Sequence, residues 1–377
     1  MPELALKNKT AIVGVGYTPM VRSTEKRLSF VGVDAALAAI EDAGLTPADI
    51  DGYFGSPSAP NRSAVHIDGV DEVSAGLMVS ALGLENMAWA ADVRGLPTSA
   101  VAYAAQALHS GVCTYALVLR AMYNPTGVRY SQINDPRIAG FEQYTVPYGQ
   151  GGAGGRHSLW LQRYMYESGA TKEEQYTLLK TQRENALRNP YAYWYGRGEL
   201  TLEDYMNARR VYEPMCLFDI DIPVTGAGAF VMTTADRARD LPHKAYIAGV
   251  VSTRQPAQRI FEVSGVPRES LNVAMLYDGY SHFTYYWLEE LGFCGKGEAH
   301  SFIQGGRIAR GGELPLNTFG GSIGEGRLHG FGHVREAAMQ VMGRAGERQV
   351  PDAGACVVAI GVGLPGETAT LLMLSGG

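Results

Sequence analysis

The segment ADVRGLPTSAVAYAAQALHS has the pattern of a loop that leads into the start of a helix. Such a loop is a common position for a catalytic nucleophile, because it brings a side chain to the end of the helix. Here the loop contains Arg94, Gly95 and Pro97, and none of them can attack a substrate. Ser99 lies further into the helix and has no obvious base beside it. The sequence therefore predicts an active-site loop without a nucleophile.

The four cysteines do not supply that nucleophile. They are far apart, lie in or next to apolar segments, and form no CxxC pair or Cys/His cluster; they are Cys113, Cys216, Cys294 and Cys356. A cysteine in such surroundings usually serves as a small buried apolar side chain. We therefore expect reduced, buried thiols in a cytoplasmic protein.

Two histidines in the segment RLHGFGHV are four residues apart. His329 and His333 would face the same way only on a helix that begins before residue 329, and Gly330 and Gly332 disfavour such a start. The sequence therefore predicts no metal site. The segments GVGYTP and GVGLPG also lack the Gly-x-Gly-x-x-Gly spacing of a dinucleotide-binding loop.

The elements around these residues follow an α/β pattern. An apolar run at 11–16 predicts a buried strand, helical spacing after Ser29 continues to Gly44, and the segment DIDGYFG predicts a second strand. A similar order of strand, helix, glycine-rich loop, helix and strand returns after residue 243, which indicates a duplication. The region between is rich in Gly, Pro, Tyr and Asn and then carries two amphipathic helices. We predict two α/β halves and an insert, at 1–124, 241–377 and 125–240.

The composition of the chain disfavours several classes of function. The chain has 377 residues, a net charge of −6 and 46% hydrophobic residues, so it can bury a large core. Nucleic acid is not an expected partner, because a phosphate backbone requires a basic surface. We expect no secretory signal, because the N-terminus lacks a basic region followed by an apolar run. We also expect no membrane span, because no apolar run approaches about 18 residues.

Several segments resemble the thiolase superfamily, and within it the sterol-carrier-protein-X and lipid-transfer-protein branch. They are AIVGVGYTP, IEDAGLTPADIDGYFG, RYMYESGATKEEQ, ENALRNPYAY, FDIDIPVTGAGAFVMTTADRARDLP, LYDGYSHFTYYWLEELGFC, GELPLNTFGGSIGEGRLHGFGHVREA and GERQVPDA. The resemblance extends over essentially the whole chain. It implies a thiolase fold of two duplicated, layered α-β-α halves with a long loop and helix insert.

The resemblance also places the four thiolase motifs on this sequence. The nucleophilic cysteine position falls at 94–95, and the Asn-Glu-Ala-Phe-like turn falls at 277–280. The Gly-His-Pro-like loop falls at 326–328 with His329 beside it, and the Cys-x-Gly-x-Gly-like turn falls at 359–363. Both thiolase cysteines are absent, so the chain cannot hold an acyl group as a thiolase does.

Among these proteins, the chain resembles most the steroid side-chain-cleaving aldolases, which lack the catalytic cysteine. The resemblance implies a carbon–carbon lyase that acts on a bulky, possibly steroid-derived 3-hydroxyacyl-CoA. One catalytic tyrosine of those aldolases matches Tyr277 here, whereas the other matches Arg327, so the proton-transfer scheme departs from theirs. A phenol needs a neighbouring cation to act as a base, and Arg327 could supply that charge or could contact the enolate oxygen directly.

We therefore predict Tyr277, Arg327 and His329 as catalytic residues. Asp278 is predicted to contact the substrate or to cap its own turn. Backbone N–H groups at Gly95 and Gly361 could form an oxyanion hole, because glycine permits close approach.

The resemblance further implies a homodimer joined by a small OB-fold partner protein, which sometimes carries a zinc ribbon. No cofactor is expected beyond the CoA of the substrate. Two alternatives remain open from the sequence. One is an acyltransferase or condensing enzyme that works on CoA thioesters without cysteine. The other is a lipid-binding subunit without catalytic activity.

Overall fold

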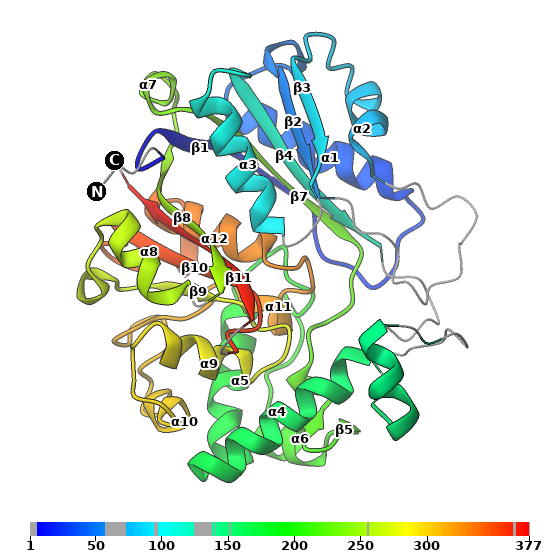
Figure 1. Cartoon of the computed structure of the whole chain (residues 1–377), viewed down its shortest axis with the longest axis vertical. Helices are drawn as coiled ribbons and strands as arrows, with labels where there is room; N and C mark the ends of the chain where they lie inside the picture. Colours follow the sequence, from blue (N-terminus) through cyan, green and yellow to red (C-terminus); the bar gives the residue numbers. More distant parts are fainter. Residues whose placement is uncertain are drawn as a thin grey trace.

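The structure is a computed structural model that describes residues 6–56, 73–93, 97–123, 138, 140–150, 152–254, 256–364 and 367–376. Its centre is a nine-stranded sheet with the strand order β3-β2-β4-β7-β1-β8-β11-β10-β9. In Figure 1 the first five of these strands lie at the top, the other four lie below them, and α4 and α6 lie at the bottom.

The strands divide into two halves. Those of the first half are β1 (Thr10–Tyr17), β2 (Gly52–Gly55), β3 (Trp89–Asp92), β4 (Tyr115–Met122) and β7 (Gly226–Thr234). Those of the second half are β8 (Ala245–Arg254), β9 (Ala274–Leu276), β10 (Ala355–Ile360) and β11 (Thr368–Ser375).

The two halves repeat one pairing scheme. β2 and β4 are parallel, as are β10 and β9, and the neighbouring pairs β4–β7 and β10–β11 are antiparallel. β7 then pairs with β1, as β11 pairs with β8, again antiparallel. The halves join where β1 pairs with β8. The predicted α/β architecture of duplicated halves is therefore confirmed.

Helices pack around both halves of the sheet. They are α1 (Leu28–Asp42), α2 (Ala75–Ala81), α3 (Pro97–His109), α7 (Ala235–Ala238), α8 (Ala257–Ser264), α9 (Phe283–Glu290), α10 (Ala299–Phe302), α11 (Gly321–Gly324) and α12 (Phe331–Val341). One core cluster joins Val101 and Ala104 of α3 to Phe331 and Val334 of α12 and to buried residues of both halves of the sheet. The second half is therefore packed directly against the first.

Glycines allow α1 to lie unusually close to β1. A Cβ atom on Gly16 would come within 2.0 Å of the Ala35 carbonyl oxygen, and one on Gly14 within 2.2 Å of the Ala39 carbonyl oxygen. No neighbouring backbone can give way by that much. The alternation of glycine with apolar residues in VGVG is therefore a packing requirement of this helix against this strand.

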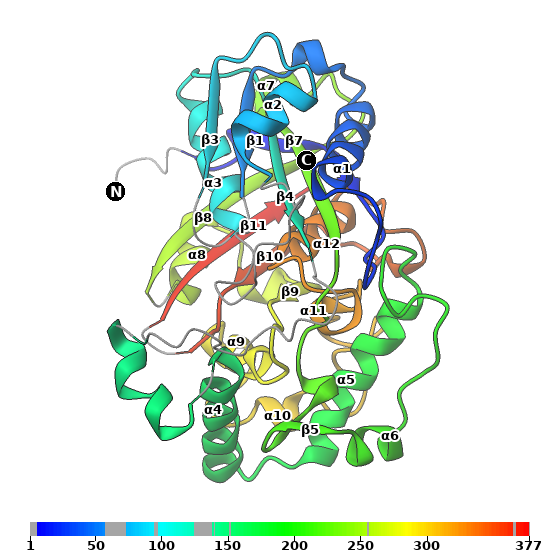
Figure 2. The same ribbon diagram turned by 90° about the vertical axis from the view of Figure 1, so that its right-hand side faces the viewer.

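The insert forms its own group of elements between β4 and β7. It contains α4 (Gly152–Ser168), α5 (Lys172–Leu187), α6 (Leu202–Asn207) and the small sheet of β5 (Arg210–Tyr212) and β6 (Met215–Cys216). α5 packs against α11, where a Cβ atom on Gly324 would come within 2.8 Å of the Ala186 side chain. Figure 2 shows α5 beside α11 and below the second half of the sheet. No helix of the described residues is long and apolar enough to span a membrane.

Candidate active site

Tyr277 lies directly after β9, at an edge shared with the end of β10. Its backbone N–H donates a hydrogen bond of 2.9 Å to the Ala359 carbonyl, which continues the parallel pairing of the two strands. A Cβ atom on Gly279 would come within 2.7 Å of the Tyr277 hydroxyl. The glycine of the LYDGY segment therefore leaves space for the phenol, whose ring also lies 5.7 Å from that of His333.

Asp278 faces inward and is fully buried. Its carboxylate accepts hydrogen bonds from the backbone N–H groups of Ser322 at 2.8 Å and Ile323 at 3.3 Å, and from Gln182 Nε2 at 3.0 Å. His333 Nε2 lies 3.1 Å from the same carboxylate. Of the two predicted roles for Asp278, the structure shows a cap, although the cap is on α11 rather than on its own turn.

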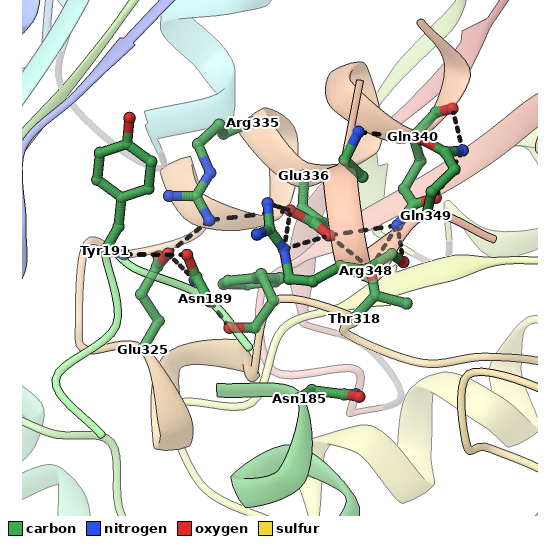
Figure 3. Close-up of polar contacts among 12 residues, drawn as sticks. Asn185, Asn189, Tyr191, Thr318, Glu325, Arg335, Glu336, Gln340, Arg348 and Gln349 are labelled. Atoms are coloured by element: carbon green, nitrogen blue, oxygen red, sulfur yellow. Dashed lines mark hydrogen bonds and ion pairs between the residues drawn. The ribbon is translucent and has the colours of Figure 1, made fainter. Parts of the chain in front are cut away.

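The loop from Glu325 to Gly330 carries the other predicted residues. Glu325 anchors the start of the loop, because its carboxylate accepts hydrogen bonds from Tyr17 Oη at 2.9 Å and Asn189 Nδ2 at 2.8 Å. Arg335 forms an ion pair with it at 2.6 Å (Figure 3). The same figure shows Glu336 of α12 paired with Arg348. This buried network fixes α12 and the loop before it.

Arg327 and His329 follow that anchor. The Arg327 backbone N–H donates to the Ile222 carbonyl at 2.8 Å, which ties the loop to the segment before β7. His329 has φ = 49°, a left-handed conformation that non-glycine residues seldom adopt. α12 begins only at Phe331, as predicted, so His329 and His333 do not share a helix face.

His329 contacts a buried arginine from the first half of the chain. Arg120, on β4, places Nη2 2.5 Å from His329 Nδ1. Its other terminal nitrogen donates to the Ser56 carbonyl at 3.0 Å and to the Ser56 hydroxyl at 2.9 Å. A guanidinium can only donate, so His329 Nδ1 is the acceptor and the proton of the neutral ring is on Nε2.

The electrostatic surroundings keep Tyr277 protonated at neutral pH. Burial is the largest influence and raises the pKa of Tyr277 well above its usual value, and the nearby carboxylate of Asp221 raises it further. Arg327 lowers the pKa of Tyr277, as expected of a neighbouring cation, but does not outweigh these two effects. Tyr277 is therefore a proton donor in the resting site, not a base.

His329 and Arg120 have shifted pKa values for related reasons. Burial, Arg120 and Arg327 together lower the pKa of His329 well below its usual value, so the imidazole is neutral at pH 7. Burial and the charge of Arg327 lower the pKa of Arg120 to about 9, whereas Tyr277 acts in the opposite direction. The predicted trio of Tyr277, Arg327 and His329 is thus brought together, with Arg120 among them.

The two predicted oxyanion-hole glycines have different outcomes. Gly361 follows β10 with φ = 135°, and a Cβ atom there would come within 2.8 Å of the Ala369 side chain, so only glycine fits. Its carbonyl accepts a hydrogen bond from Trp287 Nε1 at 3.2 Å. Gly95 lies outside the described residues, so an oxyanion hole that uses both glycines stays a prediction.

A cavity of about 590 Å³ opens beside the site. It includes Asp221 and Ile222, which connect it to Tyr277 and to the Arg327 backbone. Its remaining walls combine aromatic and cationic side chains with apolar ones; the aromatic and cationic ones are Arg22, Arg183, Tyr193, Trp194, Arg209, Arg210, Tyr212 and Phe218. Such a lining suits a ligand with both apolar and anionic parts.

The four cysteines are not among the residues that make the contacts described above. Cys113, Cys216 and Cys356 are buried and Cys294 is half-buried, and none is in a disulfide. Burial is the largest influence on all of them and raises the pKa of the first two and of Cys294 to about 12. Burial also raises the pKa of Cys356. A thiol in that state is not a nucleophile at neutral pH.

Comparisons with known proteins show the family of this chain. Residues 235–376 match the family described as thiolase C-terminal domain-like. The chain is 31% identical over 394 residues to the 17-hydroxy-3-oxo-4-pregnene-20-carboxyl-CoA lyase of Mycobacterium tuberculosis, with 96% of this chain and 98% of the relative aligned. It is also 31% identical to the steroid side-chain-cleaving aldolase of Thermomonospora curvata, with 96% and 97% aligned. The chain belongs to this aldolase family.

A solved member of this aldolase group has the same fold. The structure described as the Ltp2-ChsH2(DUF35) aldolase matches with a TM-score of 0.86 and 29% sequence identity, over 98% of both chains. The predicted resemblance, the thiolase fold and the assignment to a carbon–carbon lyase are therefore confirmed.

Sequence reasoning missed two residues of this aldolase's site, Arg120 and Asp221. Arg120 occurs in the apolar run YALVLRAMY, where a single charge in a buried strand is unusual. Asp221 is the second aspartate of FDIDIPV, and nothing nearby in sequence indicates that it lies near Tyr277. Arg120 could have been predicted from the sequence, because a single charge stands out in an apolar strand. Asp221 could not, because its position depends on how the insert returns to the sheet.

Proposed function

We propose that this chain cleaves a bulky 3-hydroxyacyl-CoA by retro-aldol chemistry without a covalent enzyme intermediate, and that the acyl part is a steroid side chain. The observation that carries this proposal is the arrangement of Tyr277, which holds its proton, beside cationic Arg327. The names of the two relatives support the substrate class. Because every cysteine of the chain is buried or half-buried with a raised pKa, covalent thiolase chemistry has no group to use.

The reaction requires two proton transfers and stabilisation of one negative charge. The bond between C2 and C3 breaks, its electron pair moves onto the thioester as an enolate, and the C3 hydroxyl gives up its proton to become a carbonyl. C2 then takes up a proton, which yields a carbonyl compound and a shorter acyl-CoA. No electrons are gained or lost overall, so the proposed step needs no redox cofactor, and we propose none beyond the CoA of the substrate.

Three residues are proposed for the two proton transfers and for stabilisation of the enolate, each according to its charge. Asp221 is buried beside Tyr277 and is the proposed acceptor of the C3 hydroxyl proton. Tyr277, whose raised pKa keeps it protonated, is the proposed donor to C2. Arg327 is the proposed partner of the negative enolate, because a fixed cation in a water-poor site strongly stabilises developing charge. This scheme replaces the second tyrosine of related aldolases by an arginine.

The cavity beside Asp221 supports a large substrate. Its exposed arginines, Arg22, Arg209 and Arg210, match the phosphate groups of CoA, and its aromatic side chains match fused rings or an adenine. The proposed substrate therefore extends from the Tyr277 site into the cavity.

The proposed assembly is a homodimer with a DUF35 partner. A structure of 29% identity is described as a complex that includes DUF35, which supports the partner. The edge strand β3 supports the dimer, because its other side is unpaired among the described residues and Trp89 is 52% exposed there. An unpaired strand edge readily pairs with another strand.

The experiment that tests this proposal is an incubation with 17-hydroxy-3-oxo-4-pregnene-20-carboxyl-CoA, for the chain alone and with its co-purified partner. Release of the C17 ketone and propionyl-CoA is expected, at rates followed by chromatography and mass spectrometry. A second reaction supplies a 3-ketoacyl-CoA and free CoA. Release of acetyl-CoA only in the second reaction would replace the lyase with an acyltransferase, and no product in either would favour a lipid-binding subunit.

A further inference from the structure

Arg120 has an unusual environment for a buried arginine. It is 4% exposed, and its contacts are Ser56, the Met122 sulfur at 3.7 Å and His329. Among the residues that the structure describes, no carboxylate lies within ion-pair distance of it. Burying a charge without an anion is costly, so such a residue is retained only where its hydrogen bonds or its charge have another use.

The contact of Arg120 with His329 gives the buried guanidinium a role. His329 would adopt either neutral tautomer if its Nδ1 faced solvent, and the two tautomers differ little in energy. Arg120 excludes the tautomer with the proton on Nδ1, because its Nη2 can only donate to Nδ1. The ring proton must then lie on Nε2. The second arginine that faces His329, Arg327 on the same loop, adds positive charge and opposes a second proton on the ring.

We propose that Arg120 is a positioning residue that holds His329 as the neutral Nε2–H tautomer, so that the imidazole donates a hydrogen bond to the thioester oxygen of the acyl-CoA. This inference rests on the proposed lyase function, because the oxygen that gains negative charge is that of the enolate. His329 is partly exposed and lies beside Arg327, the proposed partner of the same enolate. His329 is therefore a hydrogen-bond donor in this scheme, and not the acid or base that its type predicts.

The arrangement also uses both halves of the duplicated fold. β4 of the first half supplies Arg120, and the loop before α12 of the second half supplies His329 and Arg327. His329 has a left-handed backbone conformation, and its imidazole contacts Arg120 on β4. The strained residue is thus held by a partner from the other half of the chain.

The decisive measurement is the ¹⁵N spectrum of histidine-labelled protein between pH 5.5 and 8, with the His329 signals assigned by their loss in His329→Gln. The wild type is expected to show a neutral Nε2–H imidazole over the whole range. In Arg120→Met, His329 is expected to populate both tautomers and to gain a proton at higher pH. Arg120→Lys should restore part of the Nε2–H form, because lysine also donates. Arg344→Met, which removes an arginine paired with Asp42 at 2.7 Å, should leave the His329 signals unchanged.

Activity supplies the second readout. Arg120→Met is expected to lower kcat at least tenfold with a smaller change in KM, and to add an acid limb to the pH profile of kcat. A wild-type His329 that is charged or carries its proton on Nδ1 at pH 7 would overturn the inference, even if Arg120→Met does not fold. An unchanged His329 spectrum in folded Arg120→Met would overturn it as well. If the tautomer shifts as expected but no acyl-CoA is cleaved, the positioning role stands and the proposed lyase function fails.

Discussion

Two buried arginines contact the loop from Glu325 to Gly330, and their charged surroundings differ. Arg335 on α12 lies 2.6 Å from a Glu325 oxygen and 3.9 Å from a Glu336 oxygen. Its guanidinium also covers the Tyr17 ring at 4.1 Å. Arg120 on β4 contacts only neutral partners among the described residues.

The pKa values show the consequence. Burial acts to lower the pKa of both arginines. At Arg335 the charges of Glu325, Tyr17 and Glu336 reverse this effect and raise the pKa above its usual value. At Arg120 no carboxylate acts in this way, and although Tyr277 raises the pKa, burial and Arg327 lower it to about 9. An arginine whose charge is balanced stabilises the fold, whereas an unbalanced one can still attract an anion that forms during a reaction. Charge balance, not burial, thus separates the structural region from the chemical one.

The largest expected effect is the loss of kcat when Tyr277 is substituted. Tyr277→Phe removes the proton that the site holds and should lower kcat by about 10²- to 10⁴-fold, as loss of a general acid does. The free energy of unfolding should change by less than about 1 kcal/mol, since a single buried hydroxyl contributes little net stability. Kinetics with the acyl-CoA substrate and urea unfolding measure the two quantities.

Tyr285→Phe is the matched control for this prediction. Tyr277 is half-buried and Tyr285 is fully buried, and the Tyr285 hydroxyl has no hydrogen-bond partner among the residues that the structure describes. The control should retain kcat within about twofold. Equal losses in both variants would show that Tyr277 acts through packing alone.

Arg335→Met tests the structural side of the comparison. It leaves Glu325 and Glu336 buried without this cation, so the free energy of unfolding should fall by about 3–5 kcal/mol. Adding Glu325→Gln should recover part of that loss, because one uncompensated charge disappears. Urea unfolding of the three proteins checks the prediction. A loss below about 1 kcal/mol in Arg335→Met would contradict the view that charge balance holds this region.

Stability should also fall on acidification. Burial lowers the pKa of His157 to about 3 and lowers those of His282 and His329 well below the usual value. Below about pH 6.5 the unfolded chain therefore binds more protons than the folded chain, and stability decreases as pH falls. Each histidine contributes at most about 1.4 kcal/mol per pH unit. Denaturant unfolding at pH 7 and pH 5 measures this slope.

His157→Phe provides the control for the pH dependence. His157 packs against the rings of Tyr280 and Phe283, each at 4.7 Å, so a phenylalanine suits the site. The slope of stability against pH should become smaller in this variant. An unchanged slope would mean that His157 does not contribute to the acid sensitivity.

The smallest expected effect concerns the cysteines. Iodoacetamide at pH 7.5 should leave the activity of the folded protein within about twofold, because the thiols hold their protons at that pH. The urea-unfolded chain should react at all four, which mass spectrometry counts. Rapid inactivation of the folded protein would favour a thiolase-like mechanism with a cysteine nucleophile. It would contradict the view that the chemistry takes place around Arg120, Tyr277 and His329.

The sequence by itself determined the architecture and the absence of thiolase chemistry. Apolar runs, glycine-rich loops and helical spacing repeat in both parts of the chain, and such local patterns directly specify strands and helices. The missing cysteines at 94–95 and 359–363 are visible in the sequence, and so is the Tyr277 motif. The glycines at Gly330 and Gly332 also predicted the late start of α12, because glycine disfavours a helix interior.

Only the tertiary structure decided what the candidate residues do. One of the two roles left open for Arg327 was to make Tyr277 a base, but burial and Asp221 outweigh its effect on the pKa of Tyr277, and neither effect has a local sequence signal. Arg120 comes from β4 and meets His329, which is more than two hundred residues later in the chain (a separation of 209). Protonation states depend on burial and on charges from distant segments, and the fold alone brings those segments together.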